Sequence, residues 1–314
     1  MEKSPLSRHI SVVVLTHNRA DELTATLEHL LSLPENPPIF VADNASSDNT
    51  VKRIKTLFPT VCVIETGANL GAAGRNVAVE CVGTEYVAFC DDDTWWSPGS
   101  LERAVQLFDE LPNVGVLNAR IVVGKDNETD PTCEVMRTSP LGHDGLPGPV
   151  LTGFMAGACV FRTVLFRRMG GYEPRLFIGG EEELLALDVL ASGNAIVYCD
   201  QLTVHHHPSA ARDSTLRRRM LARNAAWVAW LCLPWREACR TTLRALACFA
   251  AEGHFAADCA GLLRGIAWTW PKRSIMPPNV LDMRICVKAA EHRTRVAQTL
   301  HGGDRPTGRV DASI

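Results

Sequence analysis

The sequence predicts an α/β protein with a mostly parallel central sheet, helices on both faces of the sheet and a C-terminal helical extension. The first third of the chain alternates short β-branched runs with stretches of helical spacing, which is typical of parallel strands joined by crossover helices. The run ISVVVLT at 10–16 is almost continuously apolar, as a strand buried on both sides should be. From residue 214 to about residue 301 the chain is predicted to be mainly helical.

Four strands and three helices are expected within the first 90 residues. The strands are ISVVVLT, IFVADN, VCVIET and YVAFC, at 10–16, 39–44, 61–66 and 86–90. Leu23, Leu27 and Leu30 have helical spacing after the first strand. Capping residues in SSDNT begin the second helix, and GAAGRNVAVECV forms the third. The order β-α-β-α-β-α-β gives a parallel sheet.

The rest of the chain divides into further elements and two terminal regions. We expect a helix at 97–111, a strand at 114–123, an irregular stretch at 124–149 with one edge strand near 133–137, a strand at 155–162, a short helix at 163–172, a helix at 179–193 and a strand at 195–199. The chain is then divided into a sheet domain at 1–210, a helical region at 211–300 and a disordered tail at 301–314.

Composition narrows the class of protein. With 314 residues, 46% of them hydrophobic, the chain can bury a large core, and a net charge of −3 gives no field that would attract nucleic acid. The 11 cysteines contain no CxxC pair, so they are expected to be reduced, core-filling residues of a cytoplasmic protein. The longest apolar run without charge, 224–235, is shorter than the roughly 20 residues that span a membrane.

Polar clusters follow the predicted strands. THNR, DNASSD, NLGAAGRN and CDDD each follow a strand or close a strand–loop unit on the same edge of the sheet. Ligands of open parallel sheets bind beyond the carboxyl ends of the strands. The four clusters are therefore expected to form one site.

Three adjacent aspartates, Asp91, Asp92 and Asp93, follow the strand YVAFC. Their mutual repulsion is tolerated either on a solvated acidic turn or beside a bound cation. Carboxylates with phosphate oxygens and water suit Mg²⁺ or Mn²⁺. The position of the cluster at the end of a strand favours the cation site.

Three further motifs have both a structural and a functional interpretation. Glu181, Glu182 and Glu183 begin a helix, where the helix dipole alone could explain them, but a carboxylate there could also act as a general base. The histidines of TVHHHPS could form a surface cluster or supply a metal ligand. The glycines of NLGAAGRN could serve helix packing or approach a phosphate.

In this order, the motifs ISVVVLTHNRADEL, VADNASSDNT, NLGAAGRN, CDDD, LFIGGEEELLALDVLASG and VYCDQLTVHHHPS resemble those of the family 2 glycosyltransferases. The resemblance covers residues 10–209, and the bacterial rhamnosyl- and galactofuranosyl-transferases are the nearest types. It implies a GT-A fold and an inverting hexosyltransferase that uses a nucleotide-diphospho-sugar, such as a UDP- or dTDP-sugar. The implied acceptor is a hydroxyl of a glycan, a lipid-linked glycan or a small molecule.

The resemblance also implies roles for residues on the donor side. These are Thr16 and Arg19 in the nucleotide pocket, Asp43 on the base, Asn69, Gly71 and Arg75 around the sugar and phosphates, Asp91 and Asp92 on the donor, and Asp91, Asp93 and His206 on the metal. The family's DxD pair would be Asp91 and Asp93. A one-residue shift would make His205 the third ligand. The ion, Mg²⁺ or Mn²⁺, would stabilise the diphosphate leaving group as a Lewis acid.

The catalytic base departs from the family pattern. The family uses the aspartate of a Glu-Asp pair, and this chain has Glu181-Glu182, so Glu182 is the implied base. Leu184 and Asp188 replace residues that are acidic and basic in relatives, which leaves Glu181 and Glu183 as further candidates. The base would deprotonate the acceptor hydroxyl, and direct displacement would invert the anomeric centre.

Two other functions remain open at this level. A sugar nucleotidylyltransferase would need a glycine-rich triphosphate loop, and LTHNRAD has no glycine. A catalytically inactive scaffold that only binds nucleotide sugar is suggested by the glutamate that replaces the family's aspartate. The basic helical stretch at 212–230 could be a solvated helix face or could contact donor phosphates or a membrane surface. The apolar run at 227–235 and the helices after it could give a homodimer or a peripheral membrane contact, at the inner face of the membrane.

Overall fold

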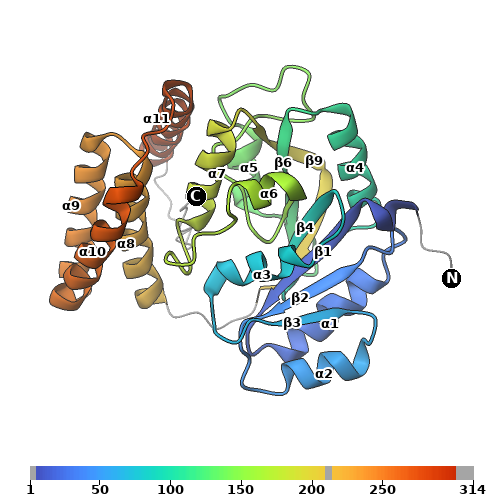
Figure 1. Cartoon of the computed structure of the whole chain (residues 1–314). Helices are drawn as coiled ribbons and strands as arrows, with labels where there is room; N and C mark the ends of the chain where they lie inside the picture. The colour runs from blue at the N-terminus through green and yellow to red at the C-terminus, as the bar shows by residue number, and fades with distance from the viewer. Residues whose placement is uncertain (1–4, 209–213, 302–314) are drawn as a thin grey trace.

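The computed structural model describes residues 5–208 and 214–301, and within them nine strands form one mixed sheet (Figure 1). The strand order is β3-β2-β1-β4-β8-β6-β9-β5, and β7 pairs with β6 beside this path. The strands are β1 Ile10–Thr16, β2 Ile39–Asp43, β3 Cys62–Glu65, β4 Tyr86–Asp91, β5 Thr94–Trp96, β6 Val114–Val123, β7 Glu128–Thr129, β8 Cys159–Arg162 and β9 Ala195–His206.

Helices cover the faces of this sheet, which confirms the predicted α/β fold class (Figure 1). The helices of the sheet region are η1 Pro5–Arg8, α1 Ala20–Leu31, α2 Thr50–Leu57, η2 Gly71–Ala73, α3 Gly74–Glu80, α4 Ser100–Glu110, α5 Pro131–Arg137, α6 Thr163–Arg168 and α7 Glu181–Ala191. The four predicted N-terminal strands and the three helices between them are all present.

The first four strands are parallel, and β1 lies between β2 and β4. Thr16 is opposite Asp43 on β2, and Leu15 is opposite Asp91 on β4. The carboxyl ends of these three strands therefore lie side by side. This register brings together the polar clusters that follow them.

The second half of the sheet contains antiparallel pairs. β8 is antiparallel to both β4 and β6, while β9 is parallel to β6. The short strand β5 follows the three aspartates directly and pairs antiparallel with β9, so that Thr94 is opposite His206. This pairing places the histidine motif next to the aspartates.

The edge strand predicted near 133–137 is wrong, because these residues belong to helix α5. Asp130 caps the helix by accepting a hydrogen bond from the N–H of Thr132, and Pro131 occupies the first turn, where its missing N–H costs nothing. Apolar alternation in a short segment cannot by itself distinguish a strand from one face of a helix.

The strand predicted at 155–162 begins only at Cys159. The residues before it bind groups other than a neighbouring strand. The N–H of Met155 donates to Asn118 Oδ1 at 2.7 Å, and the N–H of Ala156 donates to Glu182 Oε1 at 2.6 Å. The segment thereby connects the sheet to the start of α7.

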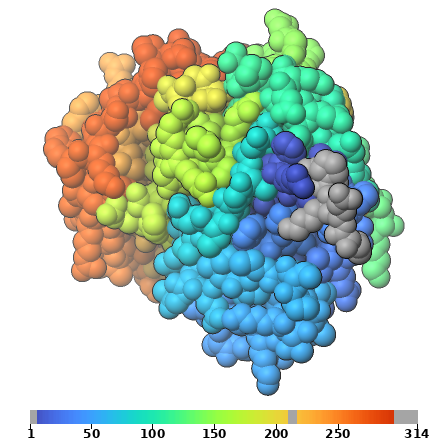
Figure 2. All heavy atoms as spheres, turned by 45° about the vertical axis from the view of Figure 1, so that its right-hand side comes forward, coloured from blue at the N-terminus to red at the C-terminus, as the bar shows by residue number. Residues whose placement is uncertain are grey.

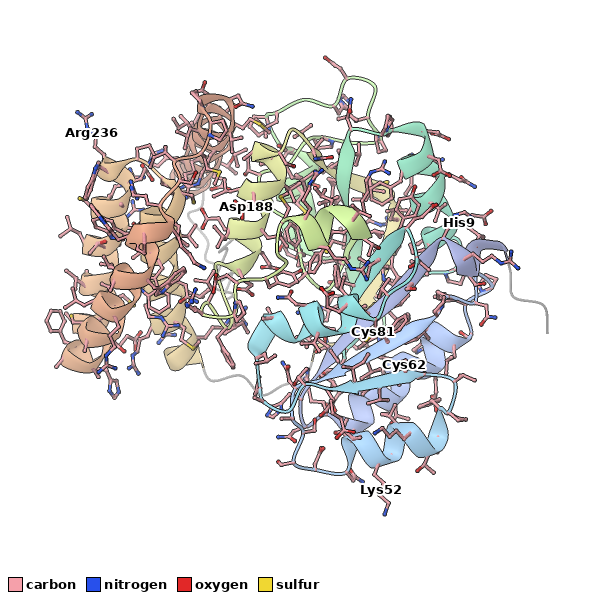
Figure 3. All side chains as sticks on the ribbon, viewed as in Figure 1. His9, Lys52, Cys62, Cys81, Asp188 and Arg236 are labelled. Carbon is pink, nitrogen blue, oxygen red and sulfur yellow. The ribbon has the colours of Figure 1, made fainter. Side chains whose placement is uncertain are left out.

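All eleven cysteines lie in the part of the chain that the structure describes, and none of them forms a disulfide. Five are buried, in agreement with the core-filling prediction: Cys90, Cys133, Cys159, Cys199 and Cys232. Cys62 and Cys81 are exposed instead (Figure 3).

The C-terminal helices gather at one side of the sheet region (Figure 1). They are α8 Ser214–Cys232, α9 Trp235–Ala251, α10 Phe255–Thr269, η3 Trp270–Lys272 and α11 Pro278–His301. In the space-filling view these helices, in orange, lie against the yellow-green segment around α7 (Figure 2). No described helix is both long enough and apolar enough to cross a membrane. The predicted tail beyond residue 301 lies outside the described residues.

The packing of α10 on α8 depends on a glycine. A Cβ at Gly265 would lie 1.8 Å from Trp227 Cε2, and Trp227 donates its indole N–H to the carbonyl of Leu262 at 3.0 Å. We predict that Gly265→Ala lowers the free energy of unfolding by about 1–3 kcal/mol, because the helices must separate to admit the methyl group. Urea denaturation followed by tryptophan fluorescence measures this.

Gly261→Ala is the matched control, because it lies one turn earlier on the same helix and its Cβ would meet nothing within 4 Å. Removing a helix-interior glycine there should be neutral or stabilise by up to about 1 kcal/mol. Equal effects of the two substitutions would contradict the described packing.

Candidate functional site

The polar clusters meet in one cleft of about 660 Å³ at the carboxyl ends of β1 and β4. Ten of the twelve predicted site residues line it: Thr16, Arg19, Asn69, Gly71, Arg75, Asp91, Asp92, Asp93, Glu181 and Glu182. Asp43 and His206 do not line it. The sequence therefore located the cleft.

Two arginines pair with the three aspartates and compensate part of their charge. Arg19 Nη1 donates to Asp92 Oδ1 at 2.6 Å and to Asp93 Oδ2 at 3.2 Å. Arg75, of which only 3% is exposed, pairs with Asp91. Charge-assisted hydrogen bonds of this kind compensate much of the cost of removing carboxylates from water. In this structure the aspartates are balanced by arginines from the loop after β1 and from α3.

Asp92 is the central and most strongly perturbed member of the cluster. Its side chain is buried and also accepts a hydrogen bond from Thr16 Oγ1 at 3.0 Å. The pKa of Asp92 is raised to about 7, mainly by burial; the charge of Arg19 opposes this rise, and the charges of Asp91 and Asp93 add to it.

Asp93 and His206 form the second polar contact of the cluster. Asp93 is buried, and its Oδ1 has no hydrogen-bond partner. His206 Nε2 lies 3.7 Å from this oxygen. His205 points the other way, stacks on Trp95 and contacts Ser97 Oγ at 2.8 Å. The histidine beside the aspartates is therefore His206.

The residues fit a hard divalent cation in part. A buried carboxylate oxygen without a partner, next to a histidine nitrogen, is a suitable pair of ligands for Mg²⁺ or Mn²⁺. Within residues 5–208 and 214–301, however, no three His, Cys, Asp or Glu side chains are arranged to hold a metal. The third predicted ligand, Asp91, is paired with Arg75 instead.

The three glutamates at the start of α7 have different surroundings. Glu181 is buried, its Oε2 has no hydrogen-bond partner, and burial raises its pKa. Glu182 lies in the cleft, and burial together with the neighbouring Glu181 raises its pKa to about 7. Glu183 pairs with Arg284 of α11 at 2.5 Å. Glu182 is thus the glutamate with a perturbed pKa whose carboxylate is fixed by a backbone N–H, that of Ala156.

The loop before α7 forms a wall of the cleft and touches NLGAAGRN. Gly71 has a φ of +60°, and a Cβ there would lie 2.0 Å from the carbonyl oxygen of Phe177. That carbonyl accepts a hydrogen bond from the N–H of Ala72 at 2.8 Å. Asn69 Oδ1 in turn accepts from the N–H of Gly71 at 3.0 Å. Gly71 therefore allows close approach of the two loops that border the cleft.

Helix α8 holds the same loop from the other side, which the sequence analysis did not anticipate. The side chain of Asn224, fully buried, lies within hydrogen-bonding distance of the carbonyls of Leu176, Ile178 and Gly179, at 2.6, 3.1 and 2.6 Å. The following residue, Gly180, has a φ of +88° and precedes Glu181. An Asn inside an otherwise apolar helical segment was the available signal for this contact.

Helix α8 also contributes side chains to the cleft itself. Arg217, Met220, Leu221 and Ala225 line it, together with Phe177 and Ile178 of the loop. These residues give one side of the cleft an apolar surface and a positive charge. The spacing of Arg217, Leu221 and Ala225 at every fourth position could have indicated one helical face.

Asp43, the predicted base-binding residue, is buried at the end of β2. Its Oδ2 accepts the N–H of Ser46 at 3.0 Å, and its Oδ1 has no partner. The neighbouring Asn44 donates to the carbonyl of Gly71 at 2.8 Å and lines the cleft.

Residues 11–170, just over half of the chain, match the family described as Glycosyl transferase family 2. An N-acetylglucosaminyl-diphospho-decaprenol L-rhamnosyltransferase of Mycobacterium tuberculosis is 25% identical over 281 residues, covering 75% of this chain and 89% of that protein.

Solved structures share the fold at low sequence identity. The mannosyltransferase PcManGT from Pyrobaculum calidifontis, in complex with GDP-Man and Mn²⁺, has a TM-score of 0.55 at 19% identity and covers 94% of this chain and 81% of its own. S. aureus TarS 1-349, in complex with UDP-GlcNAc, has a TM-score of 0.57 at 14% identity and covers 91% and 92%. The predicted GT-A fold is confirmed by these likenesses.

The raised pKa of Glu182 predicts a pH-dependent stability. The folded protein holds this proton more tightly than the unfolded chain, so the contribution is fully present below about pH 4.5 and is lost as the pH rises through about 7. Glu182→Gln removes this titration and keeps an oxygen for the N–H of Ala156. We predict that the free energy of unfolding of the variant, relative to that of the wild type, increases by on the order of 2 kcal/mol as the pH rises from 5 to 8.

Thermal and urea unfolding of both proteins across this pH range measures the difference. Glu183→Gln is the control, because it removes a carboxylate of the same helix that is paired with Arg284. If the difference in unfolding free energy between Glu182→Gln and the wild type does not grow with pH, the folded protein does not raise the pKa of Glu182.

Proposed function

The chain belongs to glycosyl transferase family 2, and we propose that it transfers a sugar from a nucleotide-diphospho-sugar to an acceptor hydroxyl with inversion of the anomeric centre. The observation that carries this proposal is the single cleft that holds the Asp91–Asp93 cluster and the carboxylate of Glu182 together. A leaving-group site and a base in one cleft are what direct displacement at a sugar carbon requires. The enzyme is a glycosyltransferase by family.

The donor binds, in this proposal, on the side of the cleft formed by β1, α3 and the aspartates. Arg19 and Arg75 supply positive charge for the diphosphate, and Thr16 and Asn69 supply polar contacts. Asp43 lies at the end of the strand next to β1, where the unpartnered Oδ1 could accept a hydrogen bond from a uracil or thymine base. UDP-GlcNAc and GDP-Man in the structural neighbours support a nucleotide-sugar donor.

We assign the metal to Asp93 and His206, with Asp91 as a further ligand. The support is the partnerless Oδ1 of Asp93 beside His206 and the Mn²⁺ of the mannosyltransferase neighbour. A bound Mg²⁺ or Mn²⁺ would act as a Lewis acid on the diphosphate.

Glu182 is the proposed base. A pKa of about 7 lets its carboxylate accept a proton near neutral pH, and the N–H of Ala156 fixes its orientation. Glu181 is proposed to keep the pKa of Glu182 raised through its charge, which makes it a positioning residue.

The acceptor is proposed to be a lipid-linked glycan. The mycobacterial relative acts, by its name, on an N-acetylglucosaminyl-diphospho-decaprenol. The apolar surface of Phe177, Ile178 and Leu221 and the charge of Arg217 lie on the side of the cleft away from the aspartates' strand and would suit such an acceptor. The sheet domain at 1–210 would then catalyse transfer at the cytoplasmic face of the membrane. The helices at 211–300 would form the acceptor side of the cleft.

Donor binding is tested by ligand-dependent melting. We predict that one UDP- or dTDP-sugar, at 100 times its dissociation constant, stabilises the protein by about 2.7 kcal/mol in the presence of Mn²⁺. Asp93→Ala should abolish the dependence on Mn²⁺, and Asp126→Ala, on the exposed turn before β7, should keep it. Absence of a shift with every nucleotide sugar would contradict the donor site.

Catalysis is tested by Glu182→Gln. We predict a loss of about 10²–10⁴-fold in kcat with donor stabilisation unchanged, because the base acts on the acceptor. Asp188→Asn, on the same helix but outside the cleft, should keep the activity. Transfer is followed by release of nucleoside diphosphate, and the anomeric configuration of the product by NMR. Full activity of Glu182→Gln, or retention of configuration, would overturn the assignment.

A further inference from the structure

We propose that the outer face of α9, α10 and η3 docks on an anionic lipid bilayer. This outer helical face is defined by six apolar residues and three arginines: Trp235, Cys239, Leu243, Phe255, Leu263, Trp270, Arg236, Arg240 and Arg244. This face would hold the protein on the membrane that carries the lipid-linked acceptor, so the biological purpose of docking rests on the proposed function.

Exposed apolar side chains are concentrated in the C-terminal helices. Among the described residues, twelve large hydrophobic side chains are exposed, and seven of them lie between residues 235 and 285. They are Trp235, Leu243, Phe255, Leu263, Trp270, Ile275 and Ile285. Clustered exposed apolar residues mark interaction surfaces more often than scattered ones do.

Helix α9 presents two adjacent rows on its exposed side. Trp235, Cys239 and Leu243 form an apolar row at every fourth residue, and the three arginines one position later form a parallel basic row. All six residues are exposed. Arg240 pairs with Glu237 at 2.8 Å, whereas for Arg236 and Arg244 no ion pair occurs among the described residues. Arg236 projects away from the molecule at the top of α9 (Figure 3).

A tryptophan cluster closes the same end of the helices. Trp235 and Trp270 are each more than half exposed, and their ring centroids are 5.7 Å apart. Trp230 packs edge-on against Trp235, and Arg273 lies 5.4 Å from the Trp235 ring. Tryptophans with one apolar side and nearby cations are typical of the water–lipid interface.

The charge of the helical region differs from that of the rest of the chain. Residues 214–294 contain 13 Lys and Arg and 5 Asp and Glu, a net charge of +8, whereas the remaining residues carry −11. An anionic surface would attract the helices and repel the sheet domain, so the charge would orient the molecule.

The same charge argues against a second copy as the occupant. A two-fold dimer brings identical patches together, and here each patch would meet arginines of the same sign. A neutral partner would leave those arginines without compensation. An anionic bilayer satisfies both rows of α9 at once, with lipid headgroups for the arginines and the acyl boundary for the apolar row.

The geometry connects this surface to the cleft. Helix α8 carries the cleft residue Arg217 near its start and Trp230 of the tryptophan cluster near its end, about 20 Å apart along the helix. A lipid-linked acceptor could therefore keep its lipid in the bilayer while its sugar reaches the cleft.

Vesicle co-sedimentation tests the proposal. The full chain is mixed with vesicles of phosphatidylcholine alone or with 30% phosphatidylglycerol at low and high salt. We expect binding to the anionic vesicles that weakens with salt. Arg236→Ser with Arg244→Ser should weaken it at least tenfold, and Leu243→Ser with Leu263→Ser should also weaken it but without removing the salt dependence.

The matched control is Val164→Ser with Arg168→Ser, an exposed apolar and basic pair on α6 that should bind like the wild type. Asp93→Ala should also bind normally, so a failed donor site and a failed docking surface are distinguishable. Wild-type vesicle binding by either of the two docking-surface double variants would overturn the proposal. Failure of the wild-type protein to bind any vesicle would also overturn it. If sedimentation velocity then shows a dimer that the same double variants dissociate, the surface is a dimer interface instead.

Discussion

Three like charges at the end of a buried strand are the constraint on which the site depends. Asp91, Asp92 and Asp93 stand where β4 ends, and leaving them uncompensated in that position would cost several kcal/mol. Arg19 and Arg75 supply the compensation from two different segments. Neutralising the aspartates therefore also fixes how the loop after β1 and the helix α3 lie against β4, and so shapes the donor side of the cleft.

This arrangement leaves the cleft without surplus positive charge. Three aspartates face two paired arginines, and the carboxylates of Glu181 and Glu182 lie in the same cleft with raised pKa values. A diphosphate that enters such a site must either take an arginine from its aspartate or bring a cation with it. Asp93, which is close to His206 and has an oxygen without a partner, is the point at which a cation would relieve the imbalance.

Much of the sheet and of the cleft was predictable from sequence. Alternating strand and helix patterns predict parallel strands, and the polar residues that follow those strands are then expected at one edge of the sheet. The strands 10–16 and 86–90 and eight of the cleft residues followed from that rule, whereas Glu181 and Glu182 followed from the family resemblance. The arginine–aspartate pairs were missed, because pairing across 16 or 73 residues has no local signal. The helix at Pro131–Arg137 was missed because its cap, Asp130, lay in a stretch that was assigned as irregular. Strand β5 was missed because a strand of three residues is too short to show an alternating apolar pattern.

The contact between α8 and the loop before α7 gives the C-terminal helices a part in the geometry of the site. Asn224 holds the carbonyls of the segment just before Glu181, and a Cβ at Gly179 would lie 2.2 Å from Leu221 of the same helix. Gly179 and Gly180 both have positive φ values, and both pack directly against α8. Since α8 ends in the tryptophan cluster, a surface that fixes that cluster also fixes the helix that positions Glu182. In the proposed mode of action, membrane docking would be coupled to the orientation of Glu182 through one helix, without any contact between the lipid and the reacting groups.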